Sequence, residues 1–350
     1  MKIIVVIIAA IAFNAEALES KFTEQNSTSD RQYASARHLM MLMASNREFT
    51  KSTKIMKRKV SFQRDEVTLV GNLFTPDNFN EKNRYKAIIV QGSLTSVKEQ
   101  MPDLYGQKFA SEGFIVLAFD YSHYGESEGQ PRQLENPQIK LEDLRAAVSF
   151  LIALPYVQSI GMVGVCTSGG NAAYLAADDS RIKAMATIAG YLPDPELLSS
   201  LFGEIKVAER REAATAAKIK YTNTGEQTIV TAYSEVDKSA ANFGAPGSYD
   251  YYLNKKRGGV PQWKNELAVM SWETFQDFDP ITKAFHIKIP TIVVHADKCA
   301  FPDQAKKFYS NLQGVKELVW ADGSHFDYYD QSSQVDNAVK NVTRFFKEHL

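Results

Sequence analysis

Residues 160–170 read Ile-Gly-Met-Val-Gly-Val-Cys-Thr-Ser-Gly-Gly, and this stretch decides the fold. It predicts an apolar strand that runs into a tight turn at Cys166, with a helix beginning at once. Gly164 and Ser168 are small, as a sharp strand-to-helix turn requires on either side of its central residue. The helix N-terminus favours negative charge and would help to form a thiolate. The stretch therefore predicts a nucleophile at Cys166, with the Thr167 N–H facing a developing oxyanion.

Two other interpretations of this stretch stay open. Ser168 could be the nucleophile in a shifted register, flanked by Cys166 and Gly170. Cys166 could also be a buried structural cysteine that precedes a glycine-containing helix start. The length of the strand favours Cys166, because Gly164 directly follows the last apolar residues.

Strands and helices alternate on both sides of this turn. We expect a strand pair at 60–62 and 67–70, strands at 87–90, 114–119, 161–165, 182–188, 291–295 and 317–320, and helices at 97–112, 138–154, 169–177, 303–312 and 335–349. Such alternation predicts an α/β fold with a mostly parallel, twisted sheet and helices on both faces.

The alternation breaks at residues 191–285, which are polar, Tyr-rich and partly helical, most clearly at 204–220. An insertion between two strands of a parallel sheet would cover the C-terminal ends of the strands. We therefore expect a mainly helical cap at 191–285, inserted into a core that is formed by residues 56–190 and 286–350.

The N-terminus has the pattern of a secretory signal peptide. Lys2 is followed by an apolar run over residues 3–13 and by Ala15-Glu16-Ala17. The run is too short to span a bilayer comfortably. We expect a signal peptide at 1–17 with cleavage after Ala17, a polar extension at 18–55, and a secreted or periplasmic protein without stable membrane insertion.

The composition is that of an ordinary soluble domain, with 44% hydrophobic and 23% charged residues and a formal net charge of -1. A nucleic-acid partner is not expected, because no basic excess is present. The histidines and cysteines show no zinc spacing, and no Gly-rich phosphate loop stands out. We therefore expect neither a metal nor a cofactor.

Four blocks of sequence, in this order, resemble the α/β-hydrolase superfamily and within it the dienelactone-hydrolase-like branch, whose turn often carries a nucleophilic Cys. They are Gln91-Gly92-Ser93 with Lys98-Glu99, residues 119–127, the 160–170 stretch, and Gly323-Ser324-His325-Phe326-Asp327. The resemblance covers residues 57–350 and implies an α/β-hydrolase fold. In this family the order along the chain is nucleophile, acid, histidine, which implies His325 as the base. It also implies Ser93, or Leu94 one residue further on, as the second oxyanion N–H donor.

The catalytic acid departs from the family pattern. The family usually places an Asp a few residues after the strand that ends at His295, and here that position is Cys299. Asp297 is the first candidate for the acid, Asp194 after the 182–188 strand is the second, and Asp303 is the third. Asp303 also suits a helix N-cap.

Cys166 and Cys299 are expected to approach the same cavity. If their Cα atoms lay within a disulfide's reach, oxidation would block the nucleophile, so redox gating is a hypothesis. The sequence gives no distance between them.

These observations predict an exported hydrolase of a carboxylic ester, thioester or lactone. Cys166, His325 and Asp297 would form and cleave an acyl-enzyme of a small-molecule acyl substrate. One alternative is a catalytically impaired binding or envelope protein with this fold, which Cys299 at the acid position supports. The other is an acyltransferase or peptidase with the same triad, because fold alone does not settle function.

Overall fold

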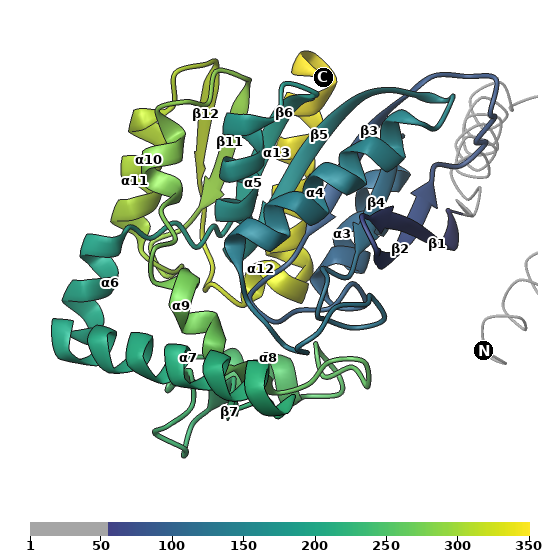
Figure 1. The fold of residues 1–350 in the computed structure, drawn as a ribbon. Helices are drawn as coiled ribbons and strands as arrows, with labels where there is room; N and C mark the ends of the chain where they lie inside the picture. The colour runs from purple at the N-terminus through teal and green to yellow at the C-terminus, as the bar shows by residue number, and fades with distance from the viewer. Residues whose placement is uncertain (1–54) are drawn as a thin grey trace, which may run out of the picture. The chain divides into compact units, whose positions relative to one another are not determined.

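A computed structural model describes residues 55–350, which are built around an eight-stranded sheet with the strand order β1-β2-β4-β3-β5-β6-β11-β12 (Figure 1). The predicted signal peptide and almost all of the predicted extension lie outside the described residues. The strands of the sheet are β1 (Met56–Arg64), β2 (Val67–Thr75), β3 (Tyr85–Gln91), β4 (Ile115–Phe119), β5 (Val157–Val165), β6 (Ile182–Ile188), β11 (Thr291–His295) and β12 (Lys316–Trp320).

The sheet is mostly parallel. β1 and β2 form a hairpin, and β2 runs antiparallel to β4, whereas every pair from β4 to β12 is parallel. The hairpin turns at Asp65, whose φ of 50° lies in the left-handed region that Asp tolerates.

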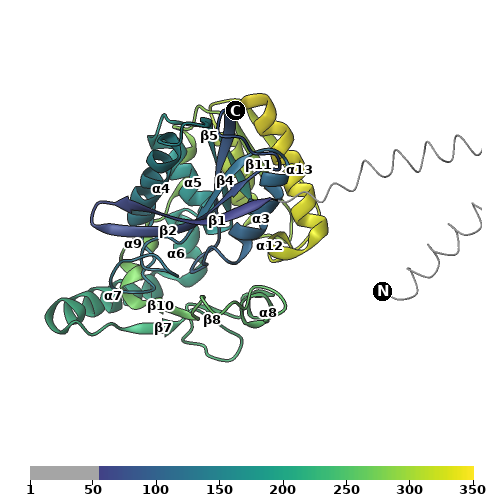
Figure 2. The ribbon, with the colours of Figure 1, turned by 90° about the vertical axis from the view of Figure 1, so that its right-hand side faces the viewer.

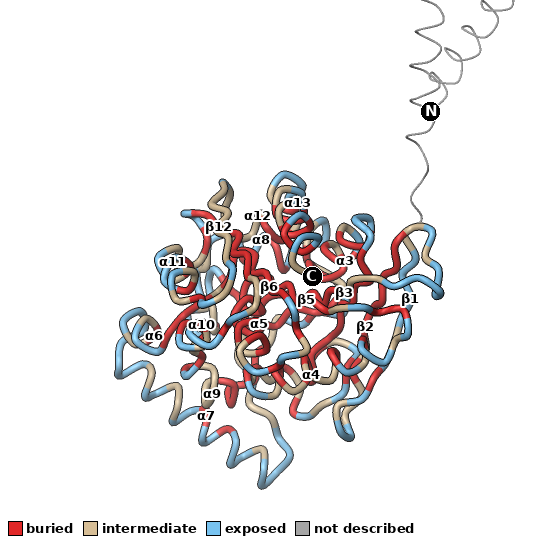
Figure 3. Tube along the Cα trace, turned by 90° about the horizontal axis from the view of Figure 1, so that it is seen from above, coloured by how far each residue is buried: buried red, intermediate tan, exposed pale blue. Residues whose placement is uncertain are grey.

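Helices cover both faces of the sheet. They include α3 (Met101–Ser111) and α13 (Ser332–His349) on one face, and α4 (Pro137–Ile152), α5 (Thr167–Asp178), α10 (Pro280–Ala284) and α11 (Pro302–Asn311) on the other. Alternate strand residues serve the two faces, because successive side chains of a strand point in opposite directions. In β3, Ile88 packs towards α3 while Ile89 packs towards α4. The buried residues gather along the central strands (Figure 3).

α3 begins at Met101, four residues later than the spacing predicts. Pro102 lies in its first turn, where a missing N–H costs nothing. The preceding residues form a turn instead, since the Lys98 N–H donates to the Asp120 carboxylate at 2.7 Å. The connection after β3 is therefore a fixed loop, and it carries Leu94 into the site described below.

Residues 191–285 hold a mixture of short helices and strands between β6 and β11. They comprise α6 (Pro195–Phe202), α7 (Glu204–Thr224), β7 (Ile229–Thr231), β8 (Tyr233–Ser234), β9 (Asn242–Phe243), α8 (Ser248–Leu253), β10 (Glu266–Ala268), a 3-10 turn (Val269–Ser271), α9 (Trp272–Phe275) and α10. Figures 1 and 2 both place most of this segment at one end of the sheet. It does not separate from the core, because the described chain forms one compact unit.

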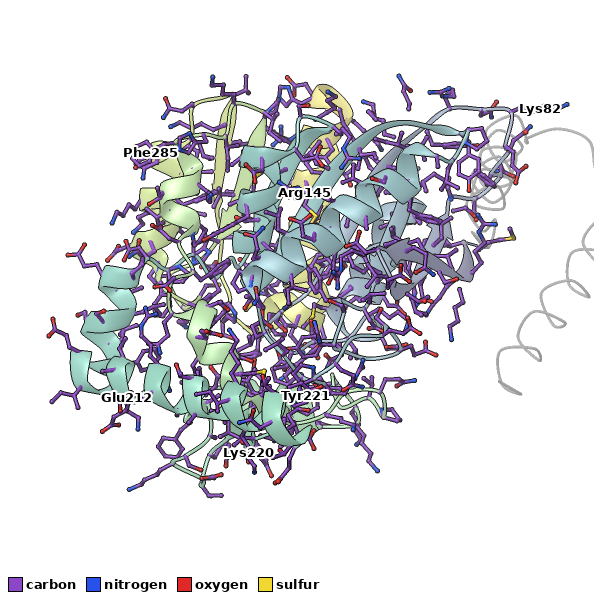
Figure 4. The ribbon with its side chains drawn as sticks, viewed as in Figure 1. Lys82, Arg145, Glu212, Lys220, Tyr221 and Phe285 are labelled. Atoms are coloured by element: carbon purple, nitrogen blue, oxygen red, sulfur yellow. The ribbon has the colours of Figure 1, made fainter. Side chains whose placement is uncertain are left out.

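Most of α7 faces solvent. Glu212 and Lys220 lie on it (Figure 4), and only Ala214 and Ala217 are fully buried. No helix within residues 55–350 combines the length and the apolar character that crossing a membrane demands.

Candidate active site

Cys166 occupies the turn between β5 and α5 with φ 55° and ψ −121°. This left-handed backbone is strained for a residue other than glycine, and surrounding contacts hold it in place. The Cys166 N–H donates to the Ile188 carbonyl at 3.1 Å, and its carbonyl accepts from the Gly169 N–H at 2.8 Å. Gly164 has no room for a side chain, because a Cβ there would lie 1.9 Å from the Ser168 carbonyl oxygen. The turn is therefore as tight as the sequence indicates.

Ser168, the alternative nucleophile, is fully buried within α5. Its hydroxyl lies 3.3 Å from that of Tyr121. Ser168 is not among the residues that line the cavity next to Cys166. The shifted register is therefore wrong for this geometry, because the turn presents residue 166 and turns residue 168 into the protein.

Cys166 and His325 line one cavity of about 590 Å³ at the C-terminal ends of the strands. The predicted insertion contributes to the walls through residues from α6, β8, β9 and α9. Most of the large side chains around the cavity are aromatic, namely Tyr191, Phe202, Tyr233, Phe275, Phe301, Phe326 and Tyr329. A cavity of this size and lining suits a small organic molecule.

Polar groups converge on the Cys166 thiol. Burial raises its pKa, while the Tyr329 hydroxyl, the Thr167 side chain and N–H, and the Leu94 N–H act in the opposite direction by hydrogen bonding. The Thr167 hydroxyl lies 3.6 Å from the sulfur. The two backbone N–H groups that act on the thiol come from Thr167 and Leu94, which lie at the start of α5 and in the loop after β3.

The predicted donor Ser93 requires a correction of one residue. The structure brings the N–H of Leu94, and not that of Ser93, to the sulfur. The Ser93 hydroxyl instead hydrogen-bonds with the hydroxyl of Tyr252, and its carbonyl accepts from Ser96. Ser93 therefore stabilises the turn between β3 and α3 through its own hydrogen bonds.

His325 is held between a backbone N–H and a tyrosine. The Ala300 N–H donates to Nδ1 at 3.2 Å, and Nε2 lies 3.2 Å from the Tyr329 hydroxyl. Burial lowers the pKa of His325 to about 4, so the ring is neutral at neutral pH. A neutral ring that accepts at Nδ1 carries its proton on Nε2. His325 therefore donates towards Tyr329, whose hydroxyl in turn interacts with Cys166.

Asp297, the first candidate for the acid, is not hydrogen-bonded to His325. It is exposed beside β12, where its carboxylate accepts from the Trp320 indole N–H at 3.0 Å. The Nδ1 of His325 accepts from the Ala300 N–H instead. The prediction for Asp297 is therefore wrong for this geometry.

The other two acid candidates lie in different surroundings. Asp194 caps α6 by accepting from the Leu197 N–H at 2.8 Å, and it pairs with Lys307 at 2.7 Å. The Asp303 side chain is 96% exposed and lies 3.6 Å from the Lys306 ammonium. It is also not the N-cap of α11, which is Phe301. Neither carboxylate is placed to orient His325.

Cys299 stands where the family pattern expects the acid. It is buried and free, lines the same cavity as Cys166, and burial raises its pKa to about 12. Its N–H donates to the Ala296 carbonyl at 3.1 Å, which closes the turn that presents Ala300 to His325. A neutral thiol thus replaces a charged carboxylate at this point of the site.

Tyr329 is the site residue that the sequence analysis missed. It belongs to α12 (Asp327–Asp330), a short helix that directly follows His325. Residues four apart lie on the same side of a helical turn, so the spacing from His325 to Tyr329 was the available signal. The short run of residues offered too little periodicity to predict that turn.

A buried ion pair fixes the loop that carries Leu94. Lys98 is 1% exposed, and its ammonium lies 2.8 Å from Asp120 and 2.7 Å from Glu126. Burial alone would lower the pKa of Lys98, but the neighbouring Asp120 charge and hydrogen bonds raise it overall. The Lys98-Glu99 and 119–127 blocks therefore hold the loop that carries Leu94. Across the described part of the chain, no cluster of three or more His, Cys, Asp or Glu side chains could hold a metal ion.

The sequence model of one protein family, described as the alpha/beta hydrolase fold, matches residues 88–332. The chain belongs to this family, and the predicted fold class is confirmed.

Relatives and solved structures agree with that assignment. Protein PA2218 of Pseudomonas aeruginosa is 32% identical over 317 residues, which span 87% of this chain and 84% of that protein. The thiohydrolase aneE of Aspergillus aculeatus is 30% identical over 274 residues, which span 75% of this chain and 86% of that protein. The crystal structure of PA2218 superposes with a TM-score of 0.75 at 30% identity and covers 85% of this chain and 94% of that one.

The predicted dienelactone-hydrolase-like branch stays a prediction. A dienelactone hydrolase from Anabaena variabilis superposes with a TM-score of 0.51 at 14% identity, covering 85% of this chain and 99% of that one. At that identity the likeness concerns the fold alone.

Proposed function

We propose that this protein hydrolyses acyl thioesters or esters through a covalent acyl-enzyme on Cys166. The observation that carries the proposal is the placement of the thiol, which sits at the strand-to-helix turn with the Leu94 and Thr167 N–H groups directed at it. That arrangement binds a tetrahedral oxyanion. The similarity to a protein named as a thiohydrolase supports the same chemistry.

The missing acid favours a thioester over an alkyl ester. A thiol leaving group has a pKa of about 8.5, so it departs without a strong proton donor, whereas an alkoxide is far more basic. His325 has no carboxylate on Nδ1, because the Ala300 N–H takes that position. The substrate that best suits this site is therefore one whose leaving group needs little help.

The acylation step uses groups that already face the thiol. Cys166 attacks the carbonyl carbon as a thiolate, which the Tyr329 hydroxyl stabilises by donating to the sulfur. The Leu94 and Thr167 N–H groups hold the oxyanion. The tetrahedral intermediate then collapses and the bond to the leaving sulfur breaks. The leaving thiolate takes up a proton from solvent, which balances the proton that Cys166 released to solvent when it formed its thiolate.

Deacylation should be the slow step. A water must lose a proton as it attacks the Cys166 thioester, and the base that lies nearest is His325. Its Nε2 carries a proton while Nδ1 accepts from Ala300, so the ring must first exchange its tautomer. We therefore expect the acyl-enzyme to accumulate, with a burst of the first product.

The test combines turnover with intact-protein mass spectrometry. Thioesters of N-acetylcysteamine and p-nitrophenyl esters are offered to the wild type, Cys166→Ala and Ser168→Ala, each with its thermal unfolding measured. We expect a burst, and an added acyl mass that maps to Cys166, in the wild type and Ser168→Ala only. Unchanged turnover in Cys166→Ala, or an adduct on Cys299, would rule the proposal out.

A binding protein is the second candidate, and one observation favours it. Cys299 occupies the acid position, so the base lacks the partner that would orient it for catalysis. Tight binding of a substrate analogue, without any adduct or turnover, would favour this candidate.

Export is a separate proposal that rests on residues outside the described range. The apolar run and the small residues before Leu18 suggest cleavage after Ala17. N-terminal sequencing of the protein recovered outside the cytoplasm should begin at Leu18, and an intact Met1 there would contradict it.

A further inference from the structure

Arg210 on α7 is a half-buried cation without an ion pair to any carboxylate among residues 55–350. Its guanidinium carbon lies 4.2 Å from the ring centroid of Phe202 and 5.0 Å from that of Trp272. Its Nε has no hydrogen-bond partner in the described structure. The neighbouring Arg211 differs in both partner and exposure, because it forms an ion pair with Asp277 at 2.6 Å near the surface.

The guanidinium lines a small hollow that adjoins the catalytic cavity. The hollow measures about 40 Å³ and shares five wall residues with the cavity of Cys166, namely Leu94, Tyr191, Phe202, Asn242 and Phe275. Gln276 also lines the hollow, and its Oε1 is an acceptor without a partner, so it would not bind an anion itself. A substrate in the catalytic cavity can extend towards the guanidinium of Arg210, which is the donor in the hollow.

The positive charge of Arg210 is not neutralised by the walls of the hollow. Glu135 is the one acidic residue among its walls, but Lys140 binds that carboxylate at 2.6 Å and the Tyr124 hydroxyl lies 3.2 Å from it. The guanidinium stays protonated at every physiological pH. A half-buried cation between two aromatic rings is pre-organised to receive an anion.

We propose that Arg210 forms a carboxylate-binding subsite, so that the substrate is an acyl thioester or ester with a second, distal carboxylate. This inference rests on the proposed function, because it places the acyl carbonyl at Cys166. The hollow is small, at about 40 Å³, which favours a carboxylate over a bulkier phosphate. The aromatic walls would cover the methylene groups between the two ends.

The experiment compares substrates that differ only in that distal group. p-Nitrophenyl half-esters of dicarboxylic acids, from succinate to suberate, are paired with neutral p-nitrophenyl esters of the same chain length. We expect kcat/KM to favour one half-ester over its neutral counterpart. Arg210→Gln should lower kcat/KM for that half-ester roughly 10- to 100-fold, as for the loss of a charged hydrogen bond, and leave the neutral ester unchanged.

Two variants keep the result interpretable. Arg211→Gln removes the neighbouring charge and should change neither substrate, while Arg210→Lys should recover part of the preference. An equal loss on charged and neutral esters in a folded Arg210→Gln protein would assign Arg210 to structure alone and overturn the inference. Preference for a distal phosphonate over the carboxylate would also overturn it.

A failure of the proposed function is distinguishable from a failure of the subsite. If the wild type turns over no ester, binding of monomethyl adipate is measured by calorimetry on Cys166→Ala with and without Arg210→Gln. Weaker binding with Arg210→Gln would support the subsite in the absence of turnover. Equal binding by both proteins, or binding by neither, would overturn it.

Discussion

The Tyr329 hydroxyl interacts with both the Cys166 thiol and the His325 ring. Burial raises the pKa of Cys166, so only a small fraction of the thiol is ionised at neutral pH, and that fraction grows as the pH rises. Tyr329→Phe removes a donor to that thiolate, so the pKa should rise further. We expect alkylation of Cys166 by iodoacetamide to fall roughly 10-fold at a fixed pH below the pKa, with its midpoint moved to higher pH.

Tyr328→Phe is the matched control for that experiment. Its hydroxyl donates to the Asp322 carbonyl at 3.2 Å and not to the thiol. The pH profile of this variant should stay with that of the wild type. A shared shift in both variants would mean that packing in α12, and not the hydroxyl of Tyr329, sets the reactivity.

Cys299→Asp should restore the missing acid. A carboxylate at this position would accept from Nδ1 of His325, which moves the ring proton from Nε2 and frees that nitrogen to act as base. We expect deacylation to accelerate roughly 10-fold or more and the burst to disappear, as stopped-flow measurements would show.

Cys299→Ser has a similar size without the charge and should leave deacylation slow. Equal rates for the Asp and Ser variants would show that the turn at 296–300 does not place residue 299 beside His325. The thermal unfolding of both variants is measured as a control, because a buried carboxylate destabilises the folded protein.

At the scale of elements, the loop between β3 and α3 depends on Lys98. Lys98→Met would leave Asp120 buried without its cation, and Asp120 is 1% exposed. Removing one partner of a buried pair costs roughly 3–5 kcal/mol. We expect that loss in the free energy of unfolding in urea, together with slower acylation, because the loop also carries the Leu94 N–H.

Lys59→Met offers the contrast, since Lys59 pairs with Glu126 at the surface. Exposed pairs contribute about 0–1 kcal/mol, so its unfolding curve should nearly match that of the wild type. Comparable losses in the two variants would contradict the role of burial at Lys98.

Helices and strands with a clear hydrophobic pattern were predictable from the sequence. Elements whose bounds depend on contacts with distant residues were not. β6 and β11 coincide with the predicted ranges because both are short apolar runs between turn residues. α3 started late because the link from Lys98 to Asp120 overrode its helical spacing. The short strands β7 to β10 and the helix α12 have too few residues to show any period.

At the scale of the whole molecule, three buried histidines make stability depend on pH. Burial lowers the pKa of His123, His295 and His325 from 6.5 to about 4, and the first two lie outside the cavity of Cys166. Below about pH 6.5 each of these histidines is therefore protonated in the unfolded chain. In the folded chain each stays neutral until the pH falls to about 4. This contribution is present above pH 6.5 and is lost as pH falls to about 4, roughly 1.4 kcal/mol per histidine per pH unit.

Urea unfolding at several pH values tests this dependence. His123→Asn and His295→Gln should each flatten the slope between pH 6.5 and 4, and Asn suits the positive φ of residue 123. His286→Gln at the exposed position 286 should leave the slope unchanged. An unaltered slope in both buried variants would assign acid sensitivity to other groups.

The sequence was sufficient for the fold and for two side chains of the site. Cys166 and His325 follow strands whose carboxyl ends meet at one edge of a parallel sheet, so their approach could be predicted. The tautomer of His325 depends on one N–H of a neighbouring turn, and the hollow at Arg210 depends on how α7 packs. Such contacts join segments far apart in the chain and leave no local pattern.

The three tryptophans of the chain lie in three different surroundings. Trp272 is next to the Arg210 guanidinium, Trp263 stacks on Tyr252 with centroids 4.9 Å apart, and Trp320 donates to Asp297 beside the turn of Cys299. The protein thus carries intrinsic fluorophores beside Arg210, in the inserted segment and beside the turn of Cys299. Replacing them with Phe in pairs would leave one emitter each time, whose spectrum reports on one of these three surroundings without any added label.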